Sequence, residues 1–233
     1  VCRIIAAFPL AGADVLDSIE IETAPNPRWA VLWLHGLGAD GHDFEPIVPQ
    51  LVAPDWPPIR FIFPHAPVRP VTVNGGMRMR AWYDILGLEI ANRQDEPGIR
   101  DSIRHVERLI DRESMRGVDE SRLVLAGFSQ GGAIALAAGV RHRRTLAGIV
   151  ALSTYLPLGD RTEAELHPAN RATPIWFGHG VADPVVPSRL GQMSCEWLRA
   201  RGYPVQWHTW PMPHSVCAEE IAACFWAVRY EAA

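Results

Sequence analysis

The hydrophobic positions of this chain form short apolar runs that alternate with longer segments of mixed polarity. Trp29–Leu34 and Leu146–Leu152 are apolar throughout, and Ile59–Phe63 is apolar except for Arg60, which is typical of strands buried on both faces of a parallel sheet. Ser18–Thr23 alternates apolar and polar residues and is predicted to be a half-exposed edge strand. Further apolar strands are expected from Leu123 onward, at Thr173–Phe177 and at Val205–Trp210.

Between these runs the polarity pattern predicts helices. Glu96–Arg116 places apolar residues on one face and charged residues on the others, and Gly117 suits its C-terminal end. A short helix broken by Pro46 and Pro49 is expected at Asp40–Leu51. Further helices are expected in the alanine-rich segment that ends at Gly139, at Arg189–Arg201 and at Ala218–Tyr230. Strands that alternate with helices predict a single α/β domain over residues 1–233, with a mostly parallel sheet and helices on both of its faces.

One segment does not fit this alternation. Pro64–Ile85 contains too much proline and glycine for a regular element, so it is predicted to be irregular. An irregular segment of this length inside a compact domain is usually functional.

Composition narrows the class of protein. A net charge of -4 gives no reason to expect a nucleic-acid partner. Cys2, Cys195, Cys217 and Cys224 have neither C-x-x-C nor metal-ligand spacing, so we expect no metal site, and reduced thiols in the cytoplasm. No apolar run approaches the length of a membrane span, and Pro9 interrupts the opening apolar segment, so we expect neither membrane insertion nor a cleaved signal peptide.

The stretch LVLAGFSQGGAIALAAG contains the pattern G-x-S-x-G at Gly127, Ser129 and Gly131. An apolar strand precedes the pattern and a helix-forming segment follows it. In this context a sharp turn lifts a nucleophilic serine clear of the sheet. A serine hydroxyl is unreactive at neutral pH unless a neighbouring base accepts its proton, so the pattern calls for a histidine.

Among the nine histidines, His214 follows the last predicted strand and fits the chain order of serine, acid and histidine. His105 and His142 lie among charged residues and are predicted to be solvated. His208 lies within a strand and is the second candidate for the base. Of the acids in the interval, which are Asp160, Glu163, Glu165, Asp183 and Glu196, we select Asp183, because it follows a strand directly in the loop GHGVADP.

Attack on a carbonyl group creates an oxyanion, which needs preorganised donors. The backbone N–H of Gln130, directly after the serine, is the first expected donor. The N–H of Leu37 is the second, because HGLG forms a glycine-rich corner after the strand Trp29–Leu34. His35 is expected to hold this corner by hydrogen bonding rather than to act on the substrate.

The blocks HGLGADG, FPHAPVRPVTVNGGMRMRAWYDILGL, GFSQGG, ALSTYLPL, HGVADPVVP and MPHS resemble, in order and spacing, the carboxylesterase and acyl-protein thioesterase (lysophospholipase-like) branch of the α/β-hydrolases. The resemblance implies the α/β-hydrolase fold with about seven strands, no metal or organic cofactor, and hydrolysis of carboxylic esters or acyl thioesters. The expected substrates are small-molecule or lipid acyl esters, including lysophospholipids, or an acylated protein. It also assigns Ser129, His214 and Asp183 as the triad, with Leu37 and Gln130 as oxyanion donors.

The resemblance further implies that a lid-like loop at about residues 69–88 covers an acyl channel. Two roles are open for Trp82, Ile85, Leu86 and Leu88, which either line this channel or serve only as packing residues. An acyltransferase with the same triad is a rival function, and a non-catalytic binding protein on this scaffold is another. The apolar loop and the exposed tryptophans are compatible with a monomer or a homodimer.

Overall fold

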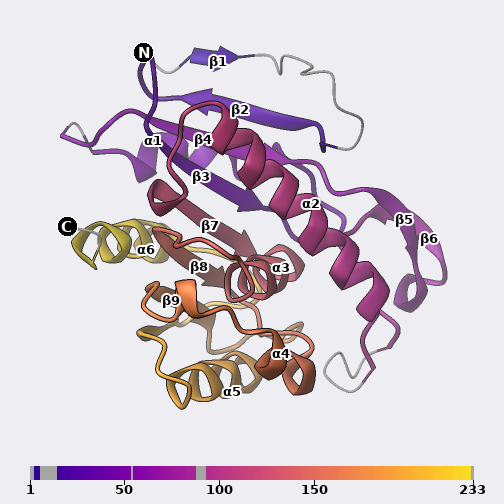
Figure 1. Ribbon diagram of the computed structural model, residues 1–233. Coiled ribbons are helices and arrows are strands. Elements are labelled where there is room, and N and C mark those ends of the chain that lie inside the picture. The colour runs from indigo at the N-terminus through magenta and orange to yellow at the C-terminus, as the bar shows by residue number, and fades with distance from the viewer. Residues whose placement is uncertain (1–2, 6–14, 54, 88–92, 232–233) are drawn as a thin grey trace.

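Eight strands form one sheet, in the order β1-β2-β4-β3-β7-β8-β9-β10 (Figure 1). The computed structural model describes residues 3–5, 15–53, 55–87 and 93–231. From β4 to β10 neighbouring strands run parallel, whereas β1 and β2 pair antiparallel at one edge. The strands are β1 (Arg3–Ile5), β2 (Ser18–Glu22), β3 (Trp29–Leu34), β4 (Ile59–Pro64), β7 (Leu123–Phe128), β8 (Gly148–Leu152), β9 (Ile175–Gly180) and β10 (Val205–Trp210).

Helices cover both faces of this sheet, as the alternating pattern predicts. Alternate residues of β7 enter opposite cores: Leu125 packs with α2 and α3, and Val124 with α1 and α6. A third cluster packs α5 against β8 and β9. The helices are α1 (Val48–Leu51), α2 (Glu96–Met115), α3 (Gln130–Gly139), α4 (Gly159–Glu165), α5 (Ser188–Arg199) and α6 (Ala218–Glu231), with 3₁₀ turns at Glu45–Ile47, Thr72–Asn74, Glu120–Arg122 and Pro168–Asn170.

The fold is therefore the α/β-hydrolase fold, with a mostly parallel sheet. The antiparallel edge strand β1 brings the strand count to eight, one more than the approximate seven expected. The helix expected over Asp40–Leu51 is reduced to a 3₁₀ turn and the four-residue α1, because Pro46 and Pro49 have no backbone N–H to donate.

The segment Pro64–Ile85 was predicted to be irregular, and this was wrong. It contains a two-stranded hairpin of β5 (Val68–Val71) and β6 (Met77–Arg80), which extends beyond the sheet at the right of Figure 1. Gly75 and Gly76 both have a positive φ, of 65° and 77°. Glycine adopts this backbone conformation without steric penalty, so the two residues reverse the chain between the strands.

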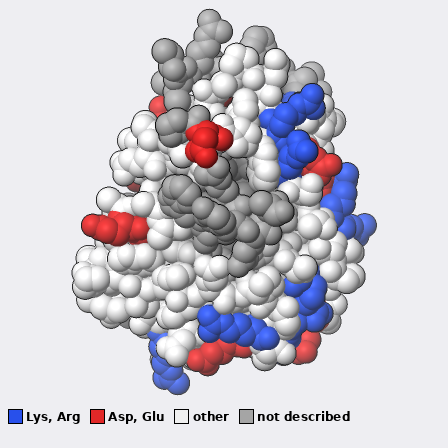
Figure 2. All heavy atoms as spheres, turned by 90° about the vertical axis from the view of Figure 1, so that its left-hand side faces the viewer, with Lys and Arg blue, Asp and Glu red and all other residues white. Residues whose placement is uncertain are grey.

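Charged side chains join α2 to the antiparallel edge of the sheet. Arg60 Nη1 lies 2.6 Å from Glu113 Oε2, and Arg60 Nη2 lies 2.8 Å from Glu22 Oε1. Both partners of the first pair are buried, so the pairing compensates the loss of hydration of two charges. On the side of the molecule shown in Figure 2, which faces away from the β5–β6 hairpin, acidic and basic side chains lie near one another along the margin.

Candidate active site

Ser129 occupies the sharp turn between β7 and α3. Its φ of 54° and ψ of -119° are unusual for a residue with a Cβ atom. The turn is held by two hydrogen bonds to the end of β8 and the loop that follows it: Ser129 N–H donates to the Leu152 carbonyl at 2.8 Å, and Thr154 Oγ1 donates to the Ser129 carbonyl at 2.7 Å. The serine side chain therefore stands at the carboxyl end of a central parallel strand.

The glycines of the G-x-S-x-G pattern are required by close backbone contacts. A Cβ atom on Gly127 would lie 2.5 Å from the Gly131 carbonyl carbon, and one on Gly131 would lie 2.3 Å from the Leu34 carbonyl oxygen. Such distances are shorter than any normal van der Waals contact. The pattern thus allows β7, the start of α3 and the end of β3 to meet around the serine.

A chain of hydrogen bonds joins Ser129 to His214 and Asp183. Ser129 Oγ lies 2.9 Å from His214 Nε2, and His214 Nδ1 lies 2.7 Å from Asp183 Oδ2. Because a carboxylate can only accept, Nδ1 carries the proton, and Nε2 is then free to accept the serine proton. The serine, the histidine and the acid selected from the sequence therefore meet at one point.

The loops that carry the acid and the histidine are bonded to each other. Val181 N–H donates to the Trp210 carbonyl at 2.9 Å, and Ala182 N–H donates to the Met212 carbonyl at 3.2 Å. A Cβ atom on Gly180 would lie 2.3 Å from the Met212 carbonyl oxygen, so β9 needs glycine where it passes the histidine loop. These contacts fix the distance between Asp183 and His214.

Asp183 is held in a fixed orientation. Its side chain is fully buried, and Oδ1 accepts hydrogen bonds from the N–H groups of Val185 and Val186, each at 2.8 Å. His179 Nε2 donates to the Val186 carbonyl at 2.8 Å and so braces the same loop. Burial lowers the pKa of His179, which keeps its imidazole neutral beside the histidine of the site.

His35 fixes the glycine-rich corner that carries Leu37. Ala66 N–H donates to His35 Nε2 at 3.1 Å, so the ring proton is on Nδ1, which donates to the Gly36 carbonyl at 2.7 Å. The Gly36 carbonyl and the Leu37 N–H belong to one planar trans peptide and point in opposite directions. His35 therefore holds the Leu37 N–H away from itself, on the side of the cleft.

The second expected donor, the N–H of Gln130, lies at the N-terminus of α3. Within the described part of the chain, neither this N–H nor that of Leu37 donates a hydrogen bond to a protein acceptor. Leu37, Ser129, Gln130 and His214 all line the same cleft, so the donors and the serine face one space.

That cleft has a volume of about 860 Å³. Its lining is mostly apolar and comes from the loops after β3, β7, β8 and β9 and from the segment that includes the β5–β6 hairpin. A second cavity of about 440 Å³ lies beside it and shares Tyr155 and Leu190 with it. The mostly apolar lining of the larger cleft suits an apolar chain.

Two of the four residues expected to line an acyl channel are placed elsewhere. Ile85 lines the cleft, whereas Trp82 is fully buried and Leu86 is not among the described lining residues. Trp82 is turned inward because its Nε1–H donates to the His35 carbonyl at 2.9 Å. Leu88 lies outside the described residues.

Tyr83, which follows the hairpin, and Tyr155, which follows a central strand, also line the cleft, and neither was predicted from the sequence. Tyr155 follows β8 by three residues, so the rule that sites lie at the carboxyl ends of strands could have found it.

Two other histidines take no part in the site. His142 was predicted to be solvated, which was wrong: it is 3% exposed and lies 2.9 Å from Glu107 and 2.6 Å from Glu120. Burial favours its neutral form, but the bonds to these two carboxylates outweigh burial and raise the pKa of His142. His208 stacks on Trp176 on an exposed strand surface, with ring centroids 5.1 Å apart.

The described residues contain no group of three or more histidine, cysteine or carboxylate side chains arranged to hold a metal ion. They also include no helix that is both long and apolar enough to cross a bilayer.

Comparison with known proteins places this site in context. Residues 17–228 match the family model described as phospholipase/carboxylesterase. An acyl-protein thioesterase 1 of Neurospora crassa is 42% identical over 208 residues, which are 83% of this chain and 82% of the relative. An acyl-protein thioesterase 1 of Cryptococcus neoformans is 38% identical over 208 residues, covering 82% of this chain and 87% of the relative.

Solved structures of related proteins also match this chain. The crystal structure of Arabidopsis thaliana SOBER1 superposes with a TM-score of 0.83 at 30% identity, covering 88% of this chain and 99% of that chain. The crystal structure of Zea mays acyl-protein thioesterase 2 superposes with a TM-score of 0.80 at 27% identity, covering 92% and 99% respectively.

Proposed function

Because this chain belongs to the phospholipase/carboxylesterase family of α/β-hydrolases, we propose that it is a serine hydrolase that cleaves carboxylic esters or acyl thioesters through an acyl-enzyme on Ser129. The observation that carries the proposal is the hydrogen-bonded chain from Ser129 Oγ through His214 to Asp183. These two hydrogen bonds place a base within reach of the serine hydroxyl and an oriented carboxylate against the base.

In the first half-reaction Ser129 Oγ attacks the acyl carbon, and its proton passes to His214 Nε2. The resulting imidazolium is stabilised by Asp183, which stays ionised. The negative charge that develops on the carbonyl oxygen is stabilised by the N–H groups of Leu37 and Gln130. The bond from the acyl carbon to the leaving oxygen or sulfur then breaks, and His214 gives its proton to that departing atom, so that the leaving group is released as an alcohol or a thiol and His214 is neutral again.

In the second half-reaction water replaces the leaving group. His214 Nε2 accepts a proton from the water as the water oxygen attacks the acyl carbon of the acyl-serine. The bond between Ser129 Oγ and the acyl carbon then breaks, the serine recovers its proton from His214, and the carboxylic acid is released. Proton and electron counts balance without any further reactant.

The relatives named above are acyl-protein thioesterases, which supports acylated substrates for this chain: small-molecule or lipid esters, or a protein that carries an acyl group. The mostly apolar cleft supports an acyl chain as the part of the substrate that binds near Ser129. We place this activity in the cytoplasm, where the free thiols of Cys195 and Cys217 would persist. We leave monomer and homodimer as the two assemblies for size-exclusion chromatography with light scattering to distinguish.

The experiment is turnover of a short 4-nitrophenyl ester and of an acyl thioester by the wild type and by Ser129→Ala. Ser153→Ala is the matched control, because Ser153 also has a positive φ, of 46°, and follows the adjacent strand β8. We expect Ser129→Ala to lose at least a thousandfold in kcat and Ser153→Ala to retain activity. Turnover that survives Ser129→Ala would reject the proposal, and an alkyl ester product in the presence of a competing alcohol would favour acyl transfer.

A further inference from the structure

Two tyrosines meet beside the candidate nucleophile. The hydroxyl oxygens of Tyr83 and Tyr155 are 3.3 Å apart. The residues are only 2% and 6% exposed, yet both line the cleft that contains Ser129 and His214. Tyr83 comes from the loop after β6 and Tyr155 from the loop after β8, so the fold brings two distant segments together at this point.

Both loops are held directly against the turn that carries the serine. Gln130 Nε2–H donates to the Tyr83 carbonyl at 2.7 Å, and Gln130 Oε1 accepts from the Trp82 N–H at 2.8 Å. On the other side, Thr154 Oγ1 donates to the Ser129 carbonyl at 2.7 Å. The tyrosine pair therefore has a fixed position relative to Ser129.

The pair has two hydroxyl protons, and only one of them is donated within the pair. Over the described chain, neither hydroxyl has another hydrogen-bond partner, so the second proton has no protein acceptor. Burial raises the pKa of both phenols, so both stay protonated at neutral pH. A buried donor without an acceptor is unfavourable, and an acceptor supplied by a ligand would relieve this.

The larger cleft, which both tyrosines line, is mostly apolar, whereas the smaller cavity, which Tyr155 also lines, carries Gln94, Glu96 and Arg161. Phe128, Ile85, Val186 and Leu190 line the larger cleft, whereas its charged lining residues, Asp43 and Arg189, are exposed at the surface. A plain alkyl chain would satisfy the apolar walls but would leave the free hydroxyl proton without a partner. A chain with an oxygen at the right position would satisfy both.

We propose that the Tyr83–Tyr155 pair selects acyl groups that carry a hydrogen-bond acceptor oxygen, such as an ether, keto or hydroxyl oxygen, over alkyl chains of the same length. This inference rests on the proposed ester hydrolysis and specifies its substrate class. The two tyrosines act as specificity-determining residues: one hydroxyl orients the other, and the second donates to the oxygen of the acyl chain.

The test is a double-mutant cycle in which one change removes the ether oxygen from the substrate and the other removes a tyrosine hydroxyl from the enzyme. The substrates are 4-nitrophenyl hexanoate and the three esters in which carbon 3, 4 or 5 of the chain is replaced by an ether oxygen, which can only accept. The enzymes are the wild type, Tyr83→Phe and Tyr155→Phe. Dividing the ether-to-alkyl ratio of kcat/KM in each variant by that of the wild type removes the intrinsic reactivity of each ester.

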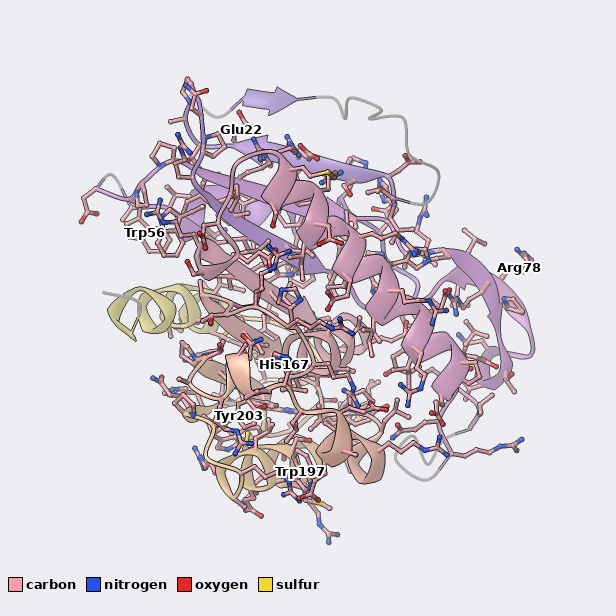
Figure 3. All side chains as sticks on the ribbon, in the orientation of Figure 1. Glu22, Trp56, Arg78, His167, Trp197 and Tyr203 are labelled. Carbon is pink, nitrogen blue, oxygen red and sulfur yellow. The ribbon has the colours of Figure 1, made fainter. Side chains whose placement is uncertain are left out.

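We expect the ether-to-alkyl ratio to fall about tenfold in both variants for at least one position of the oxygen, as the loss of one neutral hydrogen bond predicts. Tyr203→Phe is the matched control, because Tyr203 is a buried tyrosine that packs with α5, away from the hairpin marked by Arg78 (Figure 3). Its ratio should not change. Turnover of hexanoate shows that each variant is folded.

A ratio that stays within twofold of the wild type in both variants, at all three oxygen positions, would overturn the inference while leaving ester hydrolysis intact. If the wild type turned over none of the four esters and did not react with a fluorophosphonate, the proposed function itself would fail. The two failures are therefore distinguishable in one set of assays.

Discussion

His35 Nδ1 donates a hydrogen bond to the carbonyl of the next residue, Gly36, at 2.7 Å. This bond fixes the peptide that carries the Leu37 N–H, the expected oxyanion donor of the β3 loop. His35 is thus a positioning residue, whose effect on the reaction passes through the backbone.

The kinetics of His35 variants test this role. Asparagine places an N–H close to the position of Nδ1, whereas glutamine places its amide near Nε2. We expect His35→Gln to lower kcat about 10- to 100-fold with little change in KM, because a misplaced donor weakens stabilisation of the transition state more than binding of the ground state. His35→Asn should recover much of the loss. Equal kcat values for the two variants would indicate that the histidine only fills space.

His35 also predicts acid sensitivity of the fold. Burial lowers the pKa of His35 from 6.5 to about 4. Between these values the unfolded chain binds a proton that the folded chain does not, so the stability of the fold decreases as the pH falls from 6.5 to 4. The loss amounts to about 3 kcal/mol from this one group. Urea unfolding of wild type and His35→Asn at pH 7 and pH 4.5 measures it: the pH dependence should be smaller in the variant.

The buried Glu220 should make the stability of the fold decrease as the pH rises, which is opposite to the effect of His35. Its carboxyl group is buried against Gly178, where a Cβ atom would lie 2.2 Å from Oε1, and burial raises its pKa from 4.5 to about 8. Its contribution to stability is complete below pH 4.5 and is lost as the pH rises through 8, at ~1.4 kcal/mol per pH unit. Glu220→Gln should therefore gain stability relative to the wild type between pH 5 and pH 8. A difference that does not vary with pH would show that Glu220 is ionised when folded.

Because Gly131 lies directly against the Leu34 backbone, we expect that the fold does not tolerate a methyl group added at position 131. In Gly131→Ala the new Cβ would lie 2.3 Å from the Leu34 carbonyl oxygen, and backbone cannot move aside as a flexible side chain can. We expect a loss of about 3 kcal/mol or more in unfolding free energy, together with loss of activity. Gly159→Ala is the control, because no atom lies within 4 Å of its added Cβ. Thermal unfolding compares the two, and equal melting temperatures would contradict the tight packing seen at the turn.

Local patterns were sufficient to predict the main strands, the long helix α2 and the turn at Ser129, because burial on both faces and amphipathic spacing are properties of neighbouring residues. Chain order and strand ends were sufficient to select Asp183 and His214, which the structure brings to Ser129. Their catalytic roles are the proposal made above.

What could not be predicted depends on contacts between distant segments. Trp82 looks the same in sequence whether it faces a cleft or the core, and its direction is set by a hydrogen bond to the His35 carbonyl. His142 is buried only because Glu107 and Glu120 approach it from two other segments. The Tyr83–Tyr155 pair likewise joins residues 72 positions apart, and no local pattern indicates it.

The most direct test of the proposed mechanism is reaction with a fluorophosphonate, followed by mass spectrometry of the intact protein and of its peptides. We predict a single adduct on Ser129 in the wild type and in Ser153→Ala, and none in Ser129→Ala. His214→Ala should slow the labelling by several orders of magnitude, since the serine then has no base. Equal labelling of Ser129→Ala and wild type, or an adduct on a different residue, would contradict the account.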